Sequence, residues 1–478
     1  MIRSIVVNIL LLLLLSLTLT SSILLLKSIN DIITIKGKDS LRLLHSLATS
    51  DFESLTSTLN NKQCSIIMPT SFVNVKGHVL YHCNCLVSYD NINDYDIKLF
   101  IDSNQGDSLR NYFNKYIFPL DRVKVDSDKK VGTLVTGLCN SDDAHKYFGV
   151  FDNNVNKVFK KLTGDDLSLL KPEPEISWKG FKNVAVYKNH DDDNLYAWKG
   201  NPFVSIDNKD PEESFDERLK EYSSGFTFIG EDSNKLLKLL ENDGMTVPSG
   251  NERVWESMAI ATGVPSLHEI GAPMNGTALE LGLMHTISFG KGCYTGQESL
   301  SHAISASGPL IGEGKRLNGI RRRLVGLRLK PEDISKSKVI KRLLEVVDET
   351  DESVGVVTSG GVEASGIDAV DKLTEGKLLG LVKTTSIANN KQNLFIAIND
   401  NGKIDKIPVV VENLSFTRYD ATISSSSPPV TKLANKGKGI IDAPKENVAD
   451  TAAALAKTKK LEEMAAKVAK LQAKKNLQ

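Results

Sequence analysis

The feature that most constrains this chain is a short glycine-hinged segment, residues 291–298. It reads Lys-Gly-Cys-Tyr-Thr-Gly-Gln-Glu and carries an amine, a thiol, a phenol, an amide and a carboxylate. Its glycines, Gly292 and Gly296, tolerate positive φ and have no side chain, so the backbone is able to bend close to a ligand. The apolar residues Ile287 and Phe289 predict a short buried strand that holds this loop. A purely structural glycine turn explains the spacing equally well.

Cys293 is the residue of most chemical interest in this segment. An amine two residues away, on Lys291, predicts a lowered pKa for the thiol and therefore a thiolate near neutral pH. The alternative is a half-buried cysteine with a purely structural role, and the spacing leaves both interpretations open.

The segment also matches a known signature at every fixed position, K-G-C-Y-x-G-Q-E. It resembles the YgfZ family, which are folate-binding relatives of the glycine-cleavage T-protein implicated in iron–sulfur cluster assembly and repair. Residues 251–258, 263–265 and 279–283 resemble the corresponding blocks of plastid-type members. The resemblance runs from about residue 26 to about residue 423, most strongly in the middle.

Chain length and composition fit this resemblance. The 478 residues exceed one ordinary core, so two or three domains are expected. Lys plus Arg, 59, equals Asp plus Glu, 59, which argues against a nucleic-acid-binding protein. Five scattered cysteines are too few for a disulfide scaffold and indicate a reducing compartment.

The amino terminus is an almost unbroken apolar run over residues 5–26 after Arg3. This pattern is typical of a secretory signal peptide, and it is also long enough to cross a bilayer once as a retained anchor. The family resemblance implies an organelle. A plastid reached through a secretory-type signal reconciles the two, and a mitochondrion remains the alternative by analogy with the family.

Periodicity predicts an α+β amino-terminal region. A strand over 31–35, a turn at 37–40 and a helix carrying Leu41, Leu44, His45 and Leu47 are followed by a hairpin over 71–88. A strand over 97–101, a helix over 109–118 and a strand over 122–125 come next. His78, His82, Cys83 and Cys85 cluster in the hairpin, but without a second ligand pair no metal site is predicted.

The second half of the chain is predicted to contain helices over 233–240 and 251–261, the central loop, and then short glycine-broken strands. These strands, at 324–329, 354–358, 378–382, 394–398 and 407–411, predict a small antiparallel β-barrel. A low-complexity linker at 424–429 precedes a lysine- and alanine-rich helix over about 450–475, which is expected to bind a protein partner.

The expected fold is therefore multi-domain and aminomethyltransferase-like (T-protein-like), with a C-terminal small antiparallel β-barrel. Four parts are predicted: a signal peptide or membrane anchor (1–26), a T-protein-like folate-binding region of two subdomains (27–315) with insertions at about 140–221, the barrel (320–423), and the linker with its helical tail (424–478).

The resemblance also implies a site. Cys293 and Lys291 are the expected catalytic residues, and tetrahydrofolate or a related folate is the expected cofactor. The expected ligand-binding residues are Glu256, Tyr294, Gly296, Gln297 and Glu298. Two positions that are usually arginine in relatives are Ala259 and His302 here, which removes the fork that holds the carboxylates of a folate tail.

Three functions remain open from the sequence. The first is an organellar factor for iron–sulfur cluster assembly or repair, with the assembly machinery or cluster-receiving proteins as partners. The second is a tetrahydrofolate-dependent aminomethyltransferase-like one-carbon transferase, so enzymatic activity is undecided. The third is a non-catalytic interaction protein that has lost the folate pocket. Contact with a membrane is expected only through residues 5–26, if they are uncleaved.

Overall fold

In the computed structural model, the described residues are 24–55, 65–90, 94–127, 129–139, 195–199, 202–203, 224–230, 237, 247–248, 250–288, 290–306, 320–360, 371, 374–388, 393–400, 403–412, 414 and 416. All of them belong to the first of two compact units, Met1–Ser424. The apolar run up to residue 23, most of the 140–221 insertion, all but residue 237 of the helix predicted over 233–240, and the predicted tail helix lie outside the described residues. Within the described residues, no helix has both the length and the apolar character needed to cross a bilayer.

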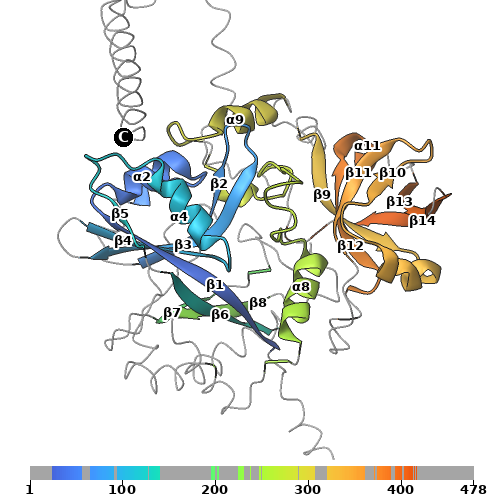
Figure 1. Cartoon of the computed structure of the whole chain (residues 1–478), viewed down its shortest axis with the longest axis horizontal. Coiled ribbons are helices and arrows are strands. Elements are labelled where there is room, and N and C mark those ends of the chain that lie inside the picture. Colours follow the sequence, from blue (N-terminus) through green and yellow to red (C-terminus); the bar gives the residue numbers. More distant parts are fainter. Residues whose placement is uncertain are drawn as a thin grey trace, which may run out of the picture. The chain divides into compact units, whose positions relative to one another are not determined.

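An eight-stranded sheet in which every strand pairs antiparallel forms the amino-terminal part (Figure 1). The strand order is β2-β3-β4-β1-β6-β8-β7, with β5 paired to β1. Residues 24–32 of β1 pair with β6 and residues 30–37 pair with β4, so this long strand joins the two halves of the sheet. The strands are β1 (Leu24–Gly37), β2 (Ser65–Val73), β3 (Val79–Asp90), β4 (Asp94–Asp102), β5 (Lys124–Val125), β6 (Lys130–Cys139), β7 (Leu195–Lys199) and β8 (Ser224–Gly230).

The strand β1 starts earlier than the periodicity predicts. Leu25 and Leu26, at the end of the apolar run, are fully buried strand residues that pair with β6. The folded region therefore includes the last three residues of that run, Leu24–Leu26.

Alternation along the strands explains why both faces of the sheet are buried. Successive side chains of a strand point to opposite faces, so Ile33 and Ile35 of β1 lie in one cluster while Ile32 lies in another. The first cluster packs under the helices α2 (Ser40–Leu47) and α4 (Gly106–Asn114), which cover one face of the sheet (Figure 1). The helix α8 (Asn251–Thr262) packs its Trp255 against the second cluster.

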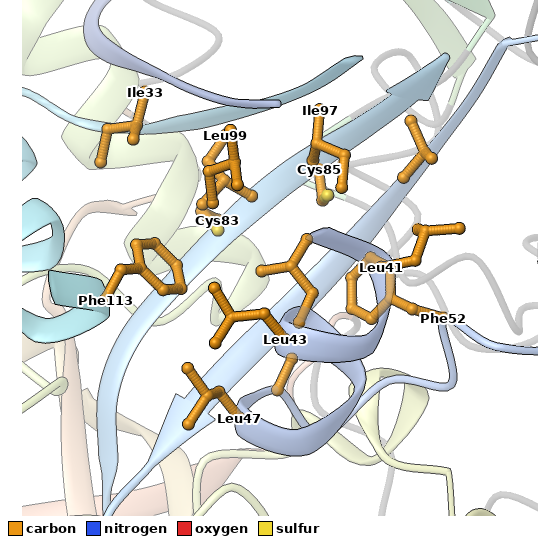
Figure 2. Close-up of a cluster of buried hydrophobic side chains, with 14 of the residues drawn as sticks. Ile33, Leu41, Leu43, Leu47, Phe52, Cys83, Cys85, Ile97, Leu99 and Phe113 are labelled. Carbon is orange, nitrogen blue, oxygen red and sulfur yellow. The ribbon is translucent and has the colours of Figure 1, made fainter. Parts of the chain in front are cut away.

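The cysteines of β3 obey the same alternation. Cys83 and Cys85 point into the cluster under α2 and α4, among Leu41, Leu99 and Phe113 (Figure 2). Burial raises the pKa of both thiols. Both cysteines are therefore core residues of the sheet.

The helix α4 is shorter than predicted and ends at Asn114 instead of residue 118. A buried carboxylate begins it, because Asp31 accepts hydrogen bonds from the backbone N–H of Gly106 at 2.9 Å and of Asn104 at 3.1 Å. Phe118 is left 67% exposed on the following loop.

The C-terminal part is a closed antiparallel barrel of six strands in the order β10-β11-β12-β9-β14-β13. Five of its strands follow the predicted segments closely, and the three-residue β10 was not predicted. A 3-10 helix, η5 (Pro331–Val339), and a short helix, α11 (Thr384–Ala388), accompany the barrel. Its strands are β9 (Arg322–Leu329), β10 (Glu345–Val347), β11 (Ser353–Ser359), β12 (Lys377–Lys383), β13 (Leu394–Asp400) and β14 (Lys403–Glu412).

Buried polar contacts join the barrel to the segment after α8. The fully buried carboxylate of Glu269 accepts hydrogen bonds from the Ser266 hydroxyl at 2.7 Å and from the Ser359 hydroxyl of β11 at 2.6 Å. Lys377 of β12 donates to the carbonyl oxygen of Ala261, near the C-terminus of α8, at 2.8 Å. Both contacts satisfy groups that are costly to bury alone.

Candidate functional site

The cysteine loop, Lys291–Gly296, lies between a 3-10 helix, η3 (Met284–Thr286), and the helix α9 (Gln297–Ala306). The predicted strand over 287–289 is wrong, because Ile287 and Ser288 are not in a strand and Phe289 lies outside the described residues. The residues just before it form η3, where the Thr286 hydroxyl donates to the Leu283 carbonyl oxygen at 2.8 Å.

The residues just before the loop are hydrogen-bonded to the segment that follows α2. The backbone N–H of Ser288 donates to the Thr49 carbonyl oxygen at 2.9 Å. The hydroxyls of Thr49 and Ser50 donate in return to the Thr286 carbonyl oxygen at 2.7 and 2.9 Å. Thr49 and Ser50 are buried, so these bonds are shielded from water.

Lys291 is the main anchor of the loop. Its side chain is buried, and its ammonium donates to the carbonyl oxygens of His45 at 2.5 Å, Ala48 at 2.5 Å and Ser50 at 2.9 Å. The Nζ atom also lies 4.4 Å from the centroid of the Tyr294 ring, where a cation is attracted to the ring face. Whether this amine also acts on the Cys293 thiol stays a prediction.

The loop completes the C-terminal end of α2. The last carbonyl groups of a helix have no partner within the helix and carry the negative end of its dipole. Here the Ser46 carbonyl oxygen accepts from the backbone N–H of Thr295 at 3.3 Å, and the His45 carbonyl oxygen accepts from Lys291. The cation of the loop thus lies at the helix end that favours positive charge.

The two glycines of the signature are not equivalent. Gly296 has a φ of +79°, and a Cβ there would lie 2.4 Å from the Asn74 carbonyl oxygen and 2.7 Å from Val73 Cγ2. The hairpin between β2 and β3 therefore requires glycine at this position. At Gly292 the nearest atom to a Cβ is His45 Nε2, at 3.9 Å, so a side chain fits there.

Cys293 is exposed, whereas Cys83 and Cys85 are buried; these three are the cysteines whose side chains the structure describes. The thiol is not sealed into apolar packing, and it stands two residues from an anchored lysine. An exposed thiol on a fixed loop is accessible to a ligand or to a partner protein.

The other predicted ligand-binding residues divide by exposure. Tyr294 is buried, its hydroxyl has no hydrogen-bond partner within the described residues, and burial raises its pKa. Gln297 is half-buried and directs its amide towards the Lys291 carbonyl oxygen at 3.5 Å. Glu298, in the first turn of α9, and Glu256, on α8, are exposed carboxylates.

The structure brings most of these residues together in the loop and at the start of α9. Glu256 lies elsewhere, on α8, although Ile260 of that helix shares a hydrophobic cluster with Tyr294. Of the two positions that are usually arginine in relatives, Ala259 is buried and His302 is exposed.

Three site residues were missed from the sequence, namely His45, Asp51 and Glu53. His45 Nδ1 lies 3.2 Å from Asp51 Oδ1, and His45 Nε2 lies 3.8 Å from Glu53 Oε2. Burial and the charge of Lys291 lower the pKa of His45. Periodicity predicts His45 only as one of the residues on the apolar face of a helix, and nothing local links these residues to a loop more than 200 positions away.

These groups set the proton affinity of the anchoring lysine. Burial lowers the pKa of Lys291 to about 7, and the carboxylates of Asp51 and Glu53 act in the opposite direction. Three carbonyl oxygens also favour the charged amine, because a hydrogen bond to the charged form stabilises it.

Comparisons with known proteins agree with this architecture. No family model matches the chain. A protein of Arabidopsis thaliana named "Putative transferase, chloroplastic" is 25% identical over 303 residues, which is 62% of this chain and 54% of that protein. The chain thus spans about half the length of the curated relative it matches.

A solved structure gives the fold. The glycine cleavage system aminomethyltransferase T from Bartonella henselae superposes with a TM-score of 0.52 and 14% identity, covering 82% of this chain and 88% of that one. The predicted aminomethyltransferase-like α+β fold with a C-terminal antiparallel barrel is confirmed.

Proposed function

We propose that this protein supports the assembly or repair of iron–sulfur proteins in a plastid, and that the Cys293 thiol is its working group. The observation that carries the proposal is the contrast among the described cysteines: Cys293 is exposed on an anchored loop, and Cys83 and Cys85 lie in the core. A thiolate is a soft ligand that suits iron–sulfur cargo. The resemblance of the loop to the YgfZ signature supports the same function.

The test is complementation of a strain that lacks this protein. Cys293→Ala should fold normally, because the side chain is exposed, and should fail to restore the activities of cluster-containing enzymes in the organelle. Thermal unfolding of both proteins provides the folding control. Full rescue by Cys293→Ala would count against the proposal. Assembly proteins or cluster-receiving proteins are the proposed partners, and the predicted tail helix is the segment proposed to bind one of them.

A folate is the proposed ligand, recognised through its pterin ring and not through its tail. The exposed carboxylate of Glu298, at the start of α9, is an acceptor for the N–H groups of a pterin, and that of Glu256, which lies apart on α8, is the alternative acceptor. The small, buried Ala259 and the exposed His302 cannot supply the paired hydrogen bonds that an arginine guanidinium gives to the carboxylates of the glutamate tail. Calorimetry should therefore give similar affinities for tetrahydrofolate and for a tetrahydropterin without a tail. Much tighter binding of tetrahydrofolate would contradict this ring-centred recognition.

The plastid is proposed because the Arabidopsis relative is named chloroplastic. A secretory-type signal in the apolar amino terminus is the proposed route. Fusion of residues 1–47, which end with α2, to a fluorescent reporter tests it. Accumulation of the reporter in mitochondria would favour the alternative organelle.

A one-carbon transferase is the second candidate, favoured by the fold shared with an aminomethyltransferase. Turnover of an aminomethylated lipoyl carrier with tetrahydrofolate by the purified protein would establish it. A ligand-free interaction protein is the third, favoured by Ala259 and His302. Absence of both binding heat and a thermal shift with folates would favour that function.

A further inference from the structure

We propose that the loop after α4, residues 115–122, docks the protein on an anionic lipid bilayer. This contact is additional to any made by the apolar amino terminus, because it uses residues of the folded region. The loop reads Lys-Tyr-Ile-Phe-Pro-Leu-Asp-Arg, with an apolar centre between a lysine and an arginine. Tyrosine and basic residues that border an apolar centre are typical of segments that lie in the membrane interface.

The loop is held firmly on the core. Ile117 and Val123, near its two ends, pack partly buried against the cluster under α2 and α4. Between them lies a β-turn with Pro119 at its second position, closed by a hydrogen bond from the backbone N–H of Asp121 to the Phe118 carbonyl oxygen at 2.9 Å. The Asp121 carboxylate accepts in return from the backbone N–H of Phe118 at 2.8 Å. The turn therefore has little conformational freedom to lose on docking.

The large apolar side chains of this loop face water. Leu120 is 93% exposed, Phe118 is 67% exposed and Tyr116 is 38% exposed. Large apolar side chains that are exposed together on a folded surface mark a site of association. At the tip of a turn they are placed to enter the boundary between lipid headgroups and acyl chains, where leaving water favours binding.

The surface around the turn carries an excess of positive charge. Its exposed cations are Lys38, Arg42, Lys115 and Arg122. Two carboxylates lie among them, Asp39 bonded to Arg122 at 3.0 Å and Asp121 at 3.9 Å from Arg42. Four cations and two carboxylates leave this surface with a net charge of +2, whereas the whole chain is neutral. This charge is complementary to the phosphates of an anionic leaflet.

An anionic bilayer fits this combination better than an acidic protein does. Lysine is depleted at protein–protein interfaces, whereas each lysine or arginine near an anionic leaflet favours binding. Arg42 lies in the first turn of α2, and the cysteine loop contacts the last turn of that helix through the Ser46 carbonyl oxygen. The docking surface therefore does not include the cysteine loop, and the proposal stands or falls separately from the role proposed for Cys293.

The test uses the full chain with a tryptophan as a local reporter, because residues 5–23 are apolar enough to bind vesicles themselves. The Leu120→Trp protein is mixed with vesicles of brominated phosphatidylcholine, either alone or with an equal part of brominated phosphatidylglycerol. Bromine on the acyl chains quenches indole fluorescence only at close range, so quenching above the wild-type level reports docking of the loop. This added quenching is expected on the anionic vesicles alone. Val410→Trp, at an exposed apolar residue of β14, is the matched control and should show none.

Further substitutions in the Leu120→Trp protein separate charge from apolar contact. Lys38→Gln together with Lys115→Gln should lower the ratio of docked to undocked loop about 25-fold, since each charge is worth about fivefold. Phe118→Asn should lower it about tenfold through lost apolar contact. Equal quenching on neutral and anionic vesicles, or none on either, would overturn the proposal. If there is none, protection of residues 115–122 from hydrogen exchange by a polyglutamate peptide would assign the surface to an acidic protein instead.

Discussion

The cysteine loop and the barrel each place a buried lysine near the C-terminal end of a helix, and they neutralise it differently. Lys291 donates to three main-chain carbonyl oxygens at the end of α2. Lys377 donates to one, that of Ala261 near the end of α8, and also lies 3.6 Å from the Glu412 carboxylate. Glu412 is in turn bound by Arg328.

The difference shows two ways in which a buried cation is compensated for the loss of water. A carboxylate partner supplies a full opposite charge, which compensates for the loss of water. Carbonyl dipoles compensate less completely, so the charge of Lys291 is easier to remove. The lysine of the barrel therefore lies within an ion network, whereas the lysine of the cysteine loop is held by main-chain carbonyl oxygens and burial lowers its pKa to about 7.

The largest effect that separates the two regions is expected from removing each lysine. Lys291→Met leaves three buried acceptors without their donor and should lower the free energy of unfolding by about 3 kcal/mol. Lys377→Met leaves Glu412 paired with Arg328 and should lower it by about 1 to 2 kcal/mol. Urea unfolding at pH 6 measures both, and equal losses would contradict the comparison.

The next effect concerns the glycines of the loop. Gly296→Ala forces a side chain into a positive φ and against the Asn74 carbonyl oxygen, so unfolding free energy should fall by about 2 kcal/mol. Gly292→Ala meets open space and should change it by less than about 0.5 kcal/mol. Thermal or urea unfolding of the pair checks this, and a large loss at Gly292 would show that the loop is packed more tightly than described.

A smaller, pH-dependent effect on stability is expected from two histidines near η3, His82 and His285. Burial lowers the pKa of His82 to about 4 and that of His285 to about 3. Between about pH 6.5 and 4 the unfolded chain binds protons that the folded chain does not, so stability is lost as the pH falls through this window. His82 Nδ1 lies 3.1 Å from the Ser71 hydroxyl oxygen, which in turn lies 3.1 Å from the Thr286 hydroxyl oxygen.

His82→Asn should therefore reduce the acid-induced loss of stability by about 1 to 2 kcal/mol between these pH values. Urea midpoints of the wild-type and variant proteins at pH 6.5 and 4.5 measure the difference. Parallel losses in the two proteins would show that His82 takes up its proton in the folded state.

The smallest effect is expected at the surface of the barrel. Lys383 and Glu352 form an ion pair at 2.8 Å with both side chains substantially exposed. Lys383→Gln should change the free energy of unfolding by less than about 0.5 kcal/mol, because water and salt screen such pairs. A larger loss of stability in this variant would mean that burial does not explain why Lys377 contributes more than the exposed Lys383 on the same strand.

Much of the fold was predictable because it is encoded locally. Barrel strands such as β9 and β12 are short apolar runs broken by glycine, and alternation in β3 placed Cys83 and Cys85 on one face. The strand predicted before the loop was wrong because tertiary contacts decide that segment. Thr49 and Ser50, distant in sequence, supply hydrogen bonds to Thr286 and Ser288, which take the place of pairing with a neighbouring strand.

The site was predictable only in part for the same reason. The signature identified three residues of the site: Cys293, Lys291 and Gly296, the position where the fold requires glycine. The carbonyl oxygens that hold Lys291 belong to residues 45–50, and a main-chain acceptor has no signature in a sequence. His45, Asp51 and Glu53 became part of the site only when the fold brought α2 to the loop.

Glu269 has a consequence for anyone who wishes to exchange parts of this protein. Its carboxylate accepts one hydrogen bond from a hydroxyl in the turn after α8 and another from a hydroxyl on strand β11 of the barrel. A barrel grafted from a relative without a hydroxyl at position 359 would leave one buried oxygen of this carboxylate without a hydrogen-bond partner. The graft would then need the serine restored, or the glutamate replaced in the same step, before the hybrid chain folds well.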